Sequence, residues 1–328
     1  MATRLGLEVL EWKTEAQPGG SVETGRLEPV SLAIGGLRVD GLVLTTVPLS
    51  GAGAFVGRKV DGILGHDVLE RYVVDIDYPN KRLRFRPADG WRHSGPGQIL
   101  PVSIEESEVF LSAGIVMPTG RTVFGSFKLD TGSVDVAGLN LNFVNDSELL
   151  DSTTRELEMG GVAVGGSTEG RLFRVATFVI GIDRIEAPLV GYTVDSGGFE
   201  NRDDAGTVGA AVLSRYRLIL DYPRHRIILE NGPSAGEKVA EDHSGMLVVS
   251  PGPAFDRLVI AQVIPGSPAA EAGLAPGEEI ISMGGRSNWM LPDARLALDQ
   301  SGPIDLVVRS DGQSREVRLE RRPLLPLN

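Results

Sequence analysis

The chain of 328 residues has no cysteine and only four histidines. Without thiols it cannot form disulfides, thiolate zinc sites or iron–sulfur clusters, and it cannot use a thiol nucleophile. The histidines are widely spaced and lack a His-x-x-x-His pattern, so we predict no metal site and no cofactor. The small number of histidines also disfavours serine hydrolysis, which leaves paired aspartates as the main hydrolytic option.

The chain also has fewer basic than acidic residues and no long hydrophobic run. The 32 Lys and Arg are outnumbered by 44 Asp and Glu, which gives a formal net charge of −12. This balance argues against nucleic acid or an anionic membrane as the main partner, because binding phosphate requires clustered cations. The apolar runs are short and interrupted by charge, so we predict no membrane span. The first residues lack an apolar signal segment. The compartment therefore stays open, and a periplasmic or secreted location is compatible with a signal that has been removed.

One segment of the chain recurs 144 residues later. The matched pairs are Gly62 and Gly206, Gly65 and Gly209, Tyr72 and Tyr216, and Asp77 and Asp221. Each copy predicts a Gly-x-x-Gly turn, a short helix, an apolar strand, an Asp-Tyr-Pro turn and a closing strand. Many short β-branched strands separated by glycine-rich turns predict a mainly β fold built on a duplication.

Asp130 lies between the two copies, at the end of a predicted strand with alternating apolar residues. This strand leads into the segment Asp130-Thr131-Gly132-Ser133. Taken alone, the Asp130-Thr131-Gly132 tripeptide is typical of an ordinary tight turn. Together with Asp61-Gly62-Ile63-Leu64-Gly65 and Thr207-Val208-Gly209, it resembles the pepsin-like and retropepsin-like aspartic proteases, in the form common in bacterial members. The resemblance covers about residues 1–231.

This resemblance implies duplicated acid-protease lobes and an aspartic endopeptidase that activates water between two carboxylates. Two carboxylates about 3 Å apart share one proton, so the pair supplies both the acid and the base of peptide hydrolysis. The implied catalytic residues are Asp130, Thr131 and Gly132. A glycine-rich hairpin flap over the substrate is implied at Gly160, Gly161, Val162, Gly165 and Gly166.

The first copy lacks the Asp-Thr-Gly or Asp-Ser-Gly loop that would supply the second carboxylate. Three explanations stay open. The first lobe is truncated at its N-terminus, or two chains pair as a homodimer so that two Asp130 loops meet, or the protein is a non-catalytic relative. In the last case, its function is that of a peptide-binding or scaffold module.

The C-terminal part resembles a PDZ domain of the kind appended to bacterial proteases. The resemblance rests on Val263-Ile264-Pro265-Gly266-Ser267-Pro268-Ala269 and on Gly277 to Gly285. Such domains bind an extended peptide as an added strand at a sheet edge, and loop amides receive its terminal carboxylate. The implied peptide-binding residues are Gly245, Met246, Leu247 and Val248, opposite a helix at Leu291 to Leu298. The implied partner is a polypeptide substrate or a C-terminal peptide.

The predicted organisation is a first lobe at residues 1–90, a second lobe at 98–231, a linker at 232–243 and a PDZ domain at 244–328. One glycine-rich run, Gly51 to Gly57, lacks the lysine of a phosphate loop, and we expect it to be a flexible loop.

Overall fold

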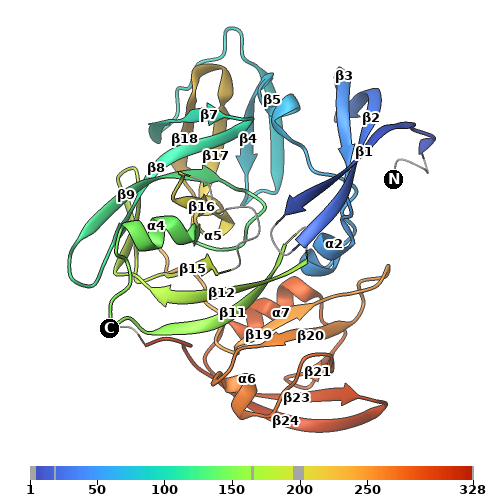
Figure 1. Ribbon diagram of the computed structural model, residues 1–328, viewed down its shortest axis with the longest axis vertical. Coiled ribbons are helices and arrows are strands. Elements are labelled where there is room, and N and C mark those ends of the chain that lie inside the picture. Colours follow the sequence, from blue (N-terminus) through green and yellow to red (C-terminus); the bar gives the residue numbers. More distant parts are fainter. Residues whose placement is uncertain (1–4, 18–19, 164–165, 195–202, 327–328) are drawn as a thin grey trace.

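The computed structural model describes residues 5–17, 20–163, 166–194 and 203–326. The fold is mainly β, as predicted, with short helices between the strands. Figure 1 shows three parts: an N-terminal sheet in blue, a central body in cyan to yellow, and a C-terminal module in orange to red. No helix among the described residues is long and apolar enough to cross a membrane.

The N-terminal sheet has three antiparallel strands in the order β1-β2-β3. They are β1 (Val9–Gln17), β2 (Gly20–Ile34) and β3 (Leu37–Thr46). Val39 and Leu42 of this sheet form a small core with Val68, which lies in the helix α3 (His66–Leu69). The run after β3 folds as the helix α2 (Ser50–Val56), so the expectation of a flexible loop there is wrong. The reason lies in the tertiary contacts of α2, described below.

The first sheet of the body has ten strands, in the order β11-β12-β15-β10-β16-β9-β8-β13-β14 with β7 paired to β8. The strands are β7 (Ser103–Glu105), β8 (Glu108–Val116), β9 (Thr122–Leu129), β10 (Ala137–Leu139), β11 (Glu156–Ala163), β12 (Gly166–Arg174), β13 (Thr177–Ile180), β14 (Asp183–Glu186), β15 (Leu189–Thr193) and β16 (Gly206–Val208). The helix α4 (Leu141–Asp146) follows β10. Phe127, Phe173 and Phe178 are fully buried in the core of this sheet, and their burial stabilises the body.

The second sheet of the body joins the two copies of the repeat, in the order β5-β4-β17-β18-β6. Its strands are β4 (Tyr72–Asp77), β5 (Arg82–Pro87), β6 (Gln98–Pro101), β17 (Tyr216–Asp221) and β18 (Arg226–Asn231). The helix α5 (Ala210–Leu213) and the 3-10 turn η1 (Tyr222–Arg224) belong to the second copy, as α3 belongs to the first. In the antiparallel pair of β4 and β17, Asp75 lies opposite Ile219, its own equivalent 144 residues later. Equivalent positions of the two copies therefore face each other about a local two-fold axis at this pair.

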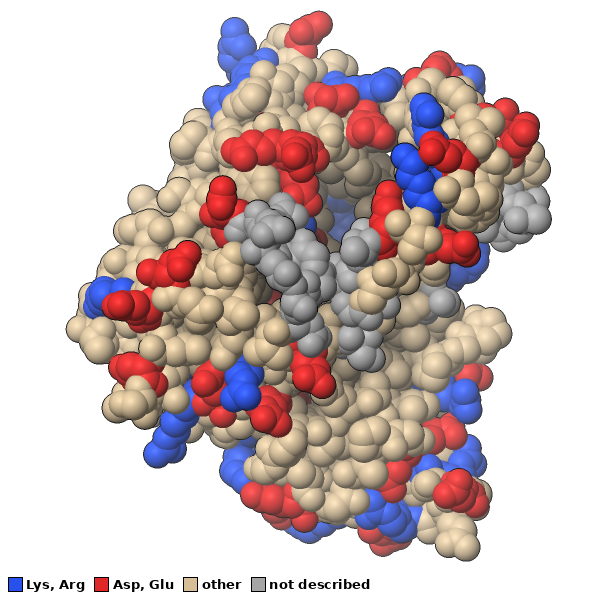
Figure 2. Space-filling model, in the orientation of Figure 1, with Lys and Arg blue, Asp and Glu red and all other residues tan. Residues whose placement is uncertain are grey.

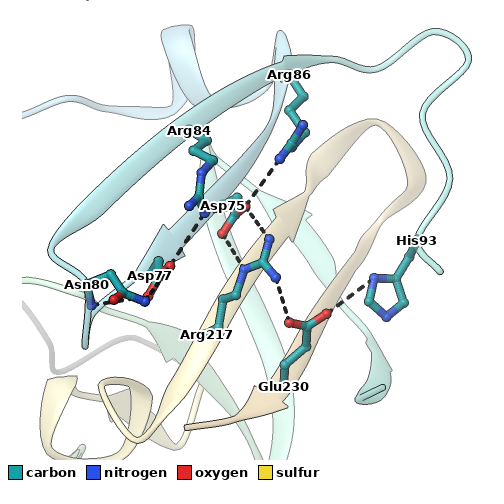
Figure 3. Close-up of polar contacts among 8 residues, drawn as sticks. All are labelled: Asp75, Asp77, Asn80, Arg84, Arg86, His93, Arg217 and Glu230. Atoms are coloured by element: carbon teal, nitrogen blue, oxygen red, sulfur yellow. Dashed lines mark hydrogen bonds and ion pairs between the residues drawn. The ribbon is translucent and has the colours of Figure 1, made fainter. Parts of the chain in front are cut away.

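A network of ion pairs crosses this two-fold axis (Figure 3). The carboxylate of Asp75 accepts hydrogen bonds from Arg217 Nε at 2.8 Å and Nη2 at 2.6 Å, and from Arg84 Nη1 at 3.2 Å. Arg217 also donates to Glu230 at 2.9 Å. Asp77 accepts from Arg84 at 3.5 Å and from the backbone and side chain of Asn80, so it also caps the turn after β4. The alternating aspartates of β4 are thus structural.

The C-terminal module has one sheet, in the order β19-β20-β21-β23-β24 with β22 paired to β21. Its elements are β19 (Met246–Val249), β20 (Leu258–Val263), α6 (Pro268–Glu271), β21 (Glu279–Met283), β22 (Arg286–Ser287), α7 (Leu291–Leu298), β23 (Gly302–Ser310) and β24 (Gln313–Arg321). The helix α7 spans the residues predicted for it. Buried residues of these strands and of α7 form a core separate from that of the body.

Candidate functional site

Asp130 follows directly after β9, as its sequence context predicts. Its Oδ1 atom accepts hydrogen bonds from the amides of Gly132, at 2.9 Å, and Ser133, at 3.2 Å. The backbone of Asp130 donates to Val208, because β9 runs parallel to β16. Thr131 and Gly132 are exposed. The carboxylate of Asp130 is therefore held by its own loop, in the manner of an Asx turn.

Asp135 is the acidic residue nearest to this loop along the chain. Its side chain reaches solvent, but it lies in a recess with protein on most sides. Desolvation in this recess raises the pKa of Asp135. The hydrogen bond from Ser133 opposes this rise, and the negative charge of Asp130 adds to it. In the first copy, Asp61 forms an ion pair with Lys59 and is not part of an Asp-Thr-Gly loop.

The predicted flap residues lie on the hairpin of β11 and β12, which packs on the C-terminal module. A Cβ atom added to Gly160 would lie 2.0 Å from Nε2 of Gln262 in β20, so a larger residue there would displace this glutamine side chain. Gly166 pairs with Ala163 at the end of the hairpin. Gly161 and Val162 belong to β11, but their side chains, like all of Gly165, lie outside the described residues.

A cavity of about 230 Å³ lies between part of this hairpin and the C-terminal module, beside their contact at Gly160. Its wall is mostly apolar and includes Met159 and Gly160 of the hairpin, Asp135 of the body, and Leu247 and Gln262 of the module. Sequence reasoning missed this cavity, because its lining residues come from segments that are far apart in the chain.

The predicted peptide-binding strand lies at the edge of the C-terminal sheet. β19 pairs with β20 on one side only, and α7 packs beside it (Figure 1). Met246 and Val248 point into the core that Leu291 and Ala294 of α7 share. Leu247, one position along, lines the cavity on the opposite face, because side chains alternate along a strand. The structure therefore brings the four predicted residues, 245–248, together at one edge.

The loop before β19 is closed by its own side chains. The carboxylate of Asp242 accepts hydrogen bonds from the amides of Ser244, at 2.9 Å, and Gly245, at 2.7 Å. The hydroxyl of Ser244 in turn accepts from the amide of Met246 at 3.1 Å. Burial raises the pKa of Asp242, and the hydrogen bonds from Ser244 and Gly245 partly offset this rise. The amides predicted to receive a peptide carboxylate thus already have acceptors within the loop.

His243 serves to attach the linker to the C-terminal module. Its Nδ1 atom lies 3.0 Å from the hydroxyl of Ser301, and its backbone bonds with those of Leu298 and Arg322. Within the part of the chain that the structure describes, no group of three His, Asp or Glu side chains is placed to hold a metal ion. Figure 2 shows acidic and basic side chains mixed over the visible face of the C-terminal module.

Residues 259–309 match the PDZ domain family. Among solved structures, the chain is similar to the photosystem II D1 C-terminal processing protease (22% identity, 26% of this chain and 24% of that chain, TM-score 0.24). It is also similar to the HtrA3 PDZ domain bound to a phage-derived ligand (19% identity, 24% and 83%, TM-score 0.23). A third is the HtrA-type protease AlgW with a decapeptide (13% identity, 74% of this chain and 85% of that chain, TM-score 0.26). No curated protein matches the sequence.

The chain therefore carries a PDZ domain, as the sequence predicted. The prediction of a pepsin-like aspartic peptidase is wrong, because the proteases among the similar structures are of the HtrA type or are the D1 processing protease. In the structure, moreover, the amides of its own loop hold Asp130, and the first copy supplies no Asp-Thr-Gly loop to face it. The catalytic roles predicted for Asp130, Thr131 and Gly132 and the flap role of the hairpin depended on that activity. Nothing in the comparisons supports the homodimer alternative.

Proposed function

We propose that this protein binds peptide segments through its PDZ domain, at the edge formed by β19 and α7. The observation that carries this proposal is the edge strand β19 lying beside α7, a helix within residues 259–309 that match the PDZ family. A strand added to β19 gains backbone hydrogen bonds, while its side chains alternate between the α7 face and the Leu247 face. The proposed binding residues are Gly245, Met246, Leu247 and Val248.

The ligand best suited to this edge is an extended peptide with an apolar end. Met246 and Val248 are buried in the core that α7 shares, so the apolar surface open to a ligand is the cavity wall around Leu247. Because the carboxylate of Asp242 already occupies the loop amides, strand addition and apolar contacts supply most of the affinity in this proposal.

We also propose the domain boundaries 1–90, 98–231, 232–243 and 244–328, with the first two regions derived from one duplicated unit. The support is the local two-fold axis between β4 and β17 and the matched positions of α3 and α5. In this proposal the body is a scaffold that carries and orients the PDZ domain.

Peptide binding is tested by titrating fluorescein-labelled peptides that end in apolar residues into the full chain and measuring fluorescence anisotropy. Leu247→Asp is expected to weaken binding at least tenfold, about 1.4 kcal/mol, because it places a charge on the half-buried face of β19. The matched control is Leu296→Asp on α7, where the side chain is 60% exposed. It should leave the Kd unchanged. Equal losses in both variants, or equal binding by Leu247→Asp and the unmodified protein, would contradict the proposed site.

A further inference from the structure

The helix α2 lies against the proposed peptide-binding edge. The amide of Ser250, directly after β19, donates a hydrogen bond of 2.8 Å to the carbonyl oxygen of Ala54. Ala54 is separated from Ser250 by almost two hundred residues, so this bond joins the N-terminal region to the PDZ domain. An incoming strand would need the same amide, because it extends the hydrogen-bonding edge of β19.

The carbonyl group of Val248 on this edge is also occupied. Arg295 of α7 donates to the oxygen of Val248 at 2.8 Å, and its guanidinium group stacks over the ring of Phe55, 4.5 Å from the ring centroid. Phe55 belongs to α2, so the helix holds this arginine across the space between β19 and α7. The amides of Met246 and Ser250 and the carbonyl group of Val248 thus all have hydrogen-bond partners within the chain.

Glycines allow α2 to approach so closely. Gly57 has a left-handed conformation (φ of 70°) and ends the helix, with its amide bonded to Gly53. A Cβ atom at Gly57 would lie 2.8 Å from Cβ of Leu291, the first residue of α7. At Gly53, an added Cβ would be in ordinary contact with the ring of Phe255, at 3.4 Å, and in tight contact only with the carbonyl of Arg58, at 3.2 Å. The glycine-rich run thus fits the surface of the PDZ domain.

A competing ligand can displace the helix α2 from the PDZ domain, because the helix is short. It has seven residues, and helices shorter than about 12 residues are marginal in water without tertiary contacts. Its fold therefore depends on its contacts with the PDZ domain and with β11. As a tethered segment it competes with free peptide at an effective concentration on the order of millimolar.

We propose that α2 is a built-in occupant of the PDZ edge and that a peptide binds by displacing it. The inference rests on the proposed peptide binding and adds its regulation. The unliganded protein is autoinhibited, and a peptide or partner that frees α2 raises the affinity of the edge. Because the coupling is reciprocal, peptide binding also releases the connection between the N-terminal sheet and the PDZ domain.

The test compares the same labelled peptides on the full chain and on Phe55→Ala. Loss of the ring removes the contact that holds Arg295, so we expect the Kd of Phe55→Ala to fall at least tenfold. The matched control, Phe124→Ala, changes a phenylalanine on β9 that is 62% exposed and should keep the original Kd. Equal affinity of the unmodified protein and Phe55→Ala would overturn autoinhibition while leaving peptide binding intact. Absence of binding in every form would overturn the proposed function itself.

A reversible lock gives a second test that does not depend on a destabilised helix. The chain has no cysteine, so Phe55→Cys with Arg295→Cys introduces the only two thiols. Joining them with a short cleavable crosslinker should weaken peptide binding at least tenfold, and cleavage should restore it in the same sample. Unchanged affinity before and after cleavage would contradict the displacement of α2.

Discussion

Asp75 is the charged residue on which the contact between the two copies of the repeat depends most. Its side chain is only 2% exposed, while Arg217 and Arg84 are each about one third exposed. Burial alone would raise the pKa of Asp75, but the hydrogen bonds and positive charges of Arg217 and Arg84 outweigh it and hold the pKa below its ordinary value. The carboxylate therefore favours the folded state when it is ionised.

Asp75→Asn is expected to lower the free energy of unfolding by about 2 kcal/mol at pH 7. A broken buried pair typically costs about 3–5 kcal/mol, and the partial exposure of both arginines reduces this figure. Urea denaturation followed by circular dichroism measures the change. The control is Asp305→Asn, whose side chain is 72% exposed beside Arg318 and whose effect should stay below about 1 kcal/mol.

The same variant has a defined pH dependence. Because the folded pKa of Asp75 is lowered, its contribution is fully present above the unfolded pKa of about 3.9 and is lost as pH falls through the folded pKa. The stability difference between the unmodified protein and Asp75→Asn should be constant from about pH 5 to 8 and shrink below about pH 4. A difference that grows on acidification would contradict this role of Asp75.

At the scale of the element, α7 ends on an unfavourable charge. Asp299 is the C-terminal cap of the helix, where a carboxylate opposes the helix dipole. Desolvation raises the pKa of Asp299 to about 6, the charge of Asp242 adds to the rise, and Arg295 opposes it. The ionised carboxylate is therefore a cost to the folded state at neutral pH.

Asp299→Asn is expected to stabilise the protein by about 1 kcal/mol at pH 7, after allowance for solvent screening. A raised acidic pKa means that the unmodified protein loses stability as pH rises from about 4 to 6, and the asparagine variant should not show this loss. Melting temperatures measured from pH 4 to 8 follow both effects. A lower melting temperature of the variant at pH 7 would contradict the assignment.

The helix α2 illustrates why one element could not be predicted. Glycine at 51, 53 and 57 disfavours a helix in isolation, so the local sequence indicates a loop. The helix forms because it is held by Ser250 and Arg295, which belong to a part of the chain far away in sequence. By contrast, α6 carries its own signal, since the hydroxyl of Ser267 accepts from the amide of Ala270 and proline follows at the first position.

At the scale of the whole molecule, Arg174 ties the body to the PDZ domain. It lies on β12, and its guanidinium group forms a bidentate pair with Glu241 of the linker at 2.6 and 2.8 Å. It also donates to the carbonyl groups of Leu325 and Pro326, close to the C-terminus. One nearly buried cation thus joins the body, the linker and the last residues of the chain.

Arg174→Ala is expected to separate the unfolding of the PDZ domain from that of the body. Removal of the cation leaves the carboxylate of Glu241 and the carbonyl groups of Ala187, Leu325 and Pro326 without this donor, which weakens the contact between the parts. Differential scanning calorimetry should then show two transitions. The control is Arg171→Ala on the same strand, whose side chain is 41% exposed and should leave the profile unchanged. A single transition at the original temperature in Arg174→Ala would contradict this role.

The sequence by itself determined the 144-residue repeat spacing, the mainly β class and the PDZ domain with its helix at α7. These features depend on local patterns: a constant spacing of 144 residues, alternating apolar positions, and glycine and proline at turns.

Only the tertiary structure determines which segments of the chain are in contact at the edge strand β19 of the PDZ domain. The Asp-Thr-Gly pattern led to the wrong activity, because a loop motif specifies the turn around Asp130 and not what faces it. The seating of α2 on β19, the hairpin against Gln262 and the pairing of β4 with β17 all join segments far apart in the chain. Such contacts depend on how whole elements pack, and no local pattern encodes them.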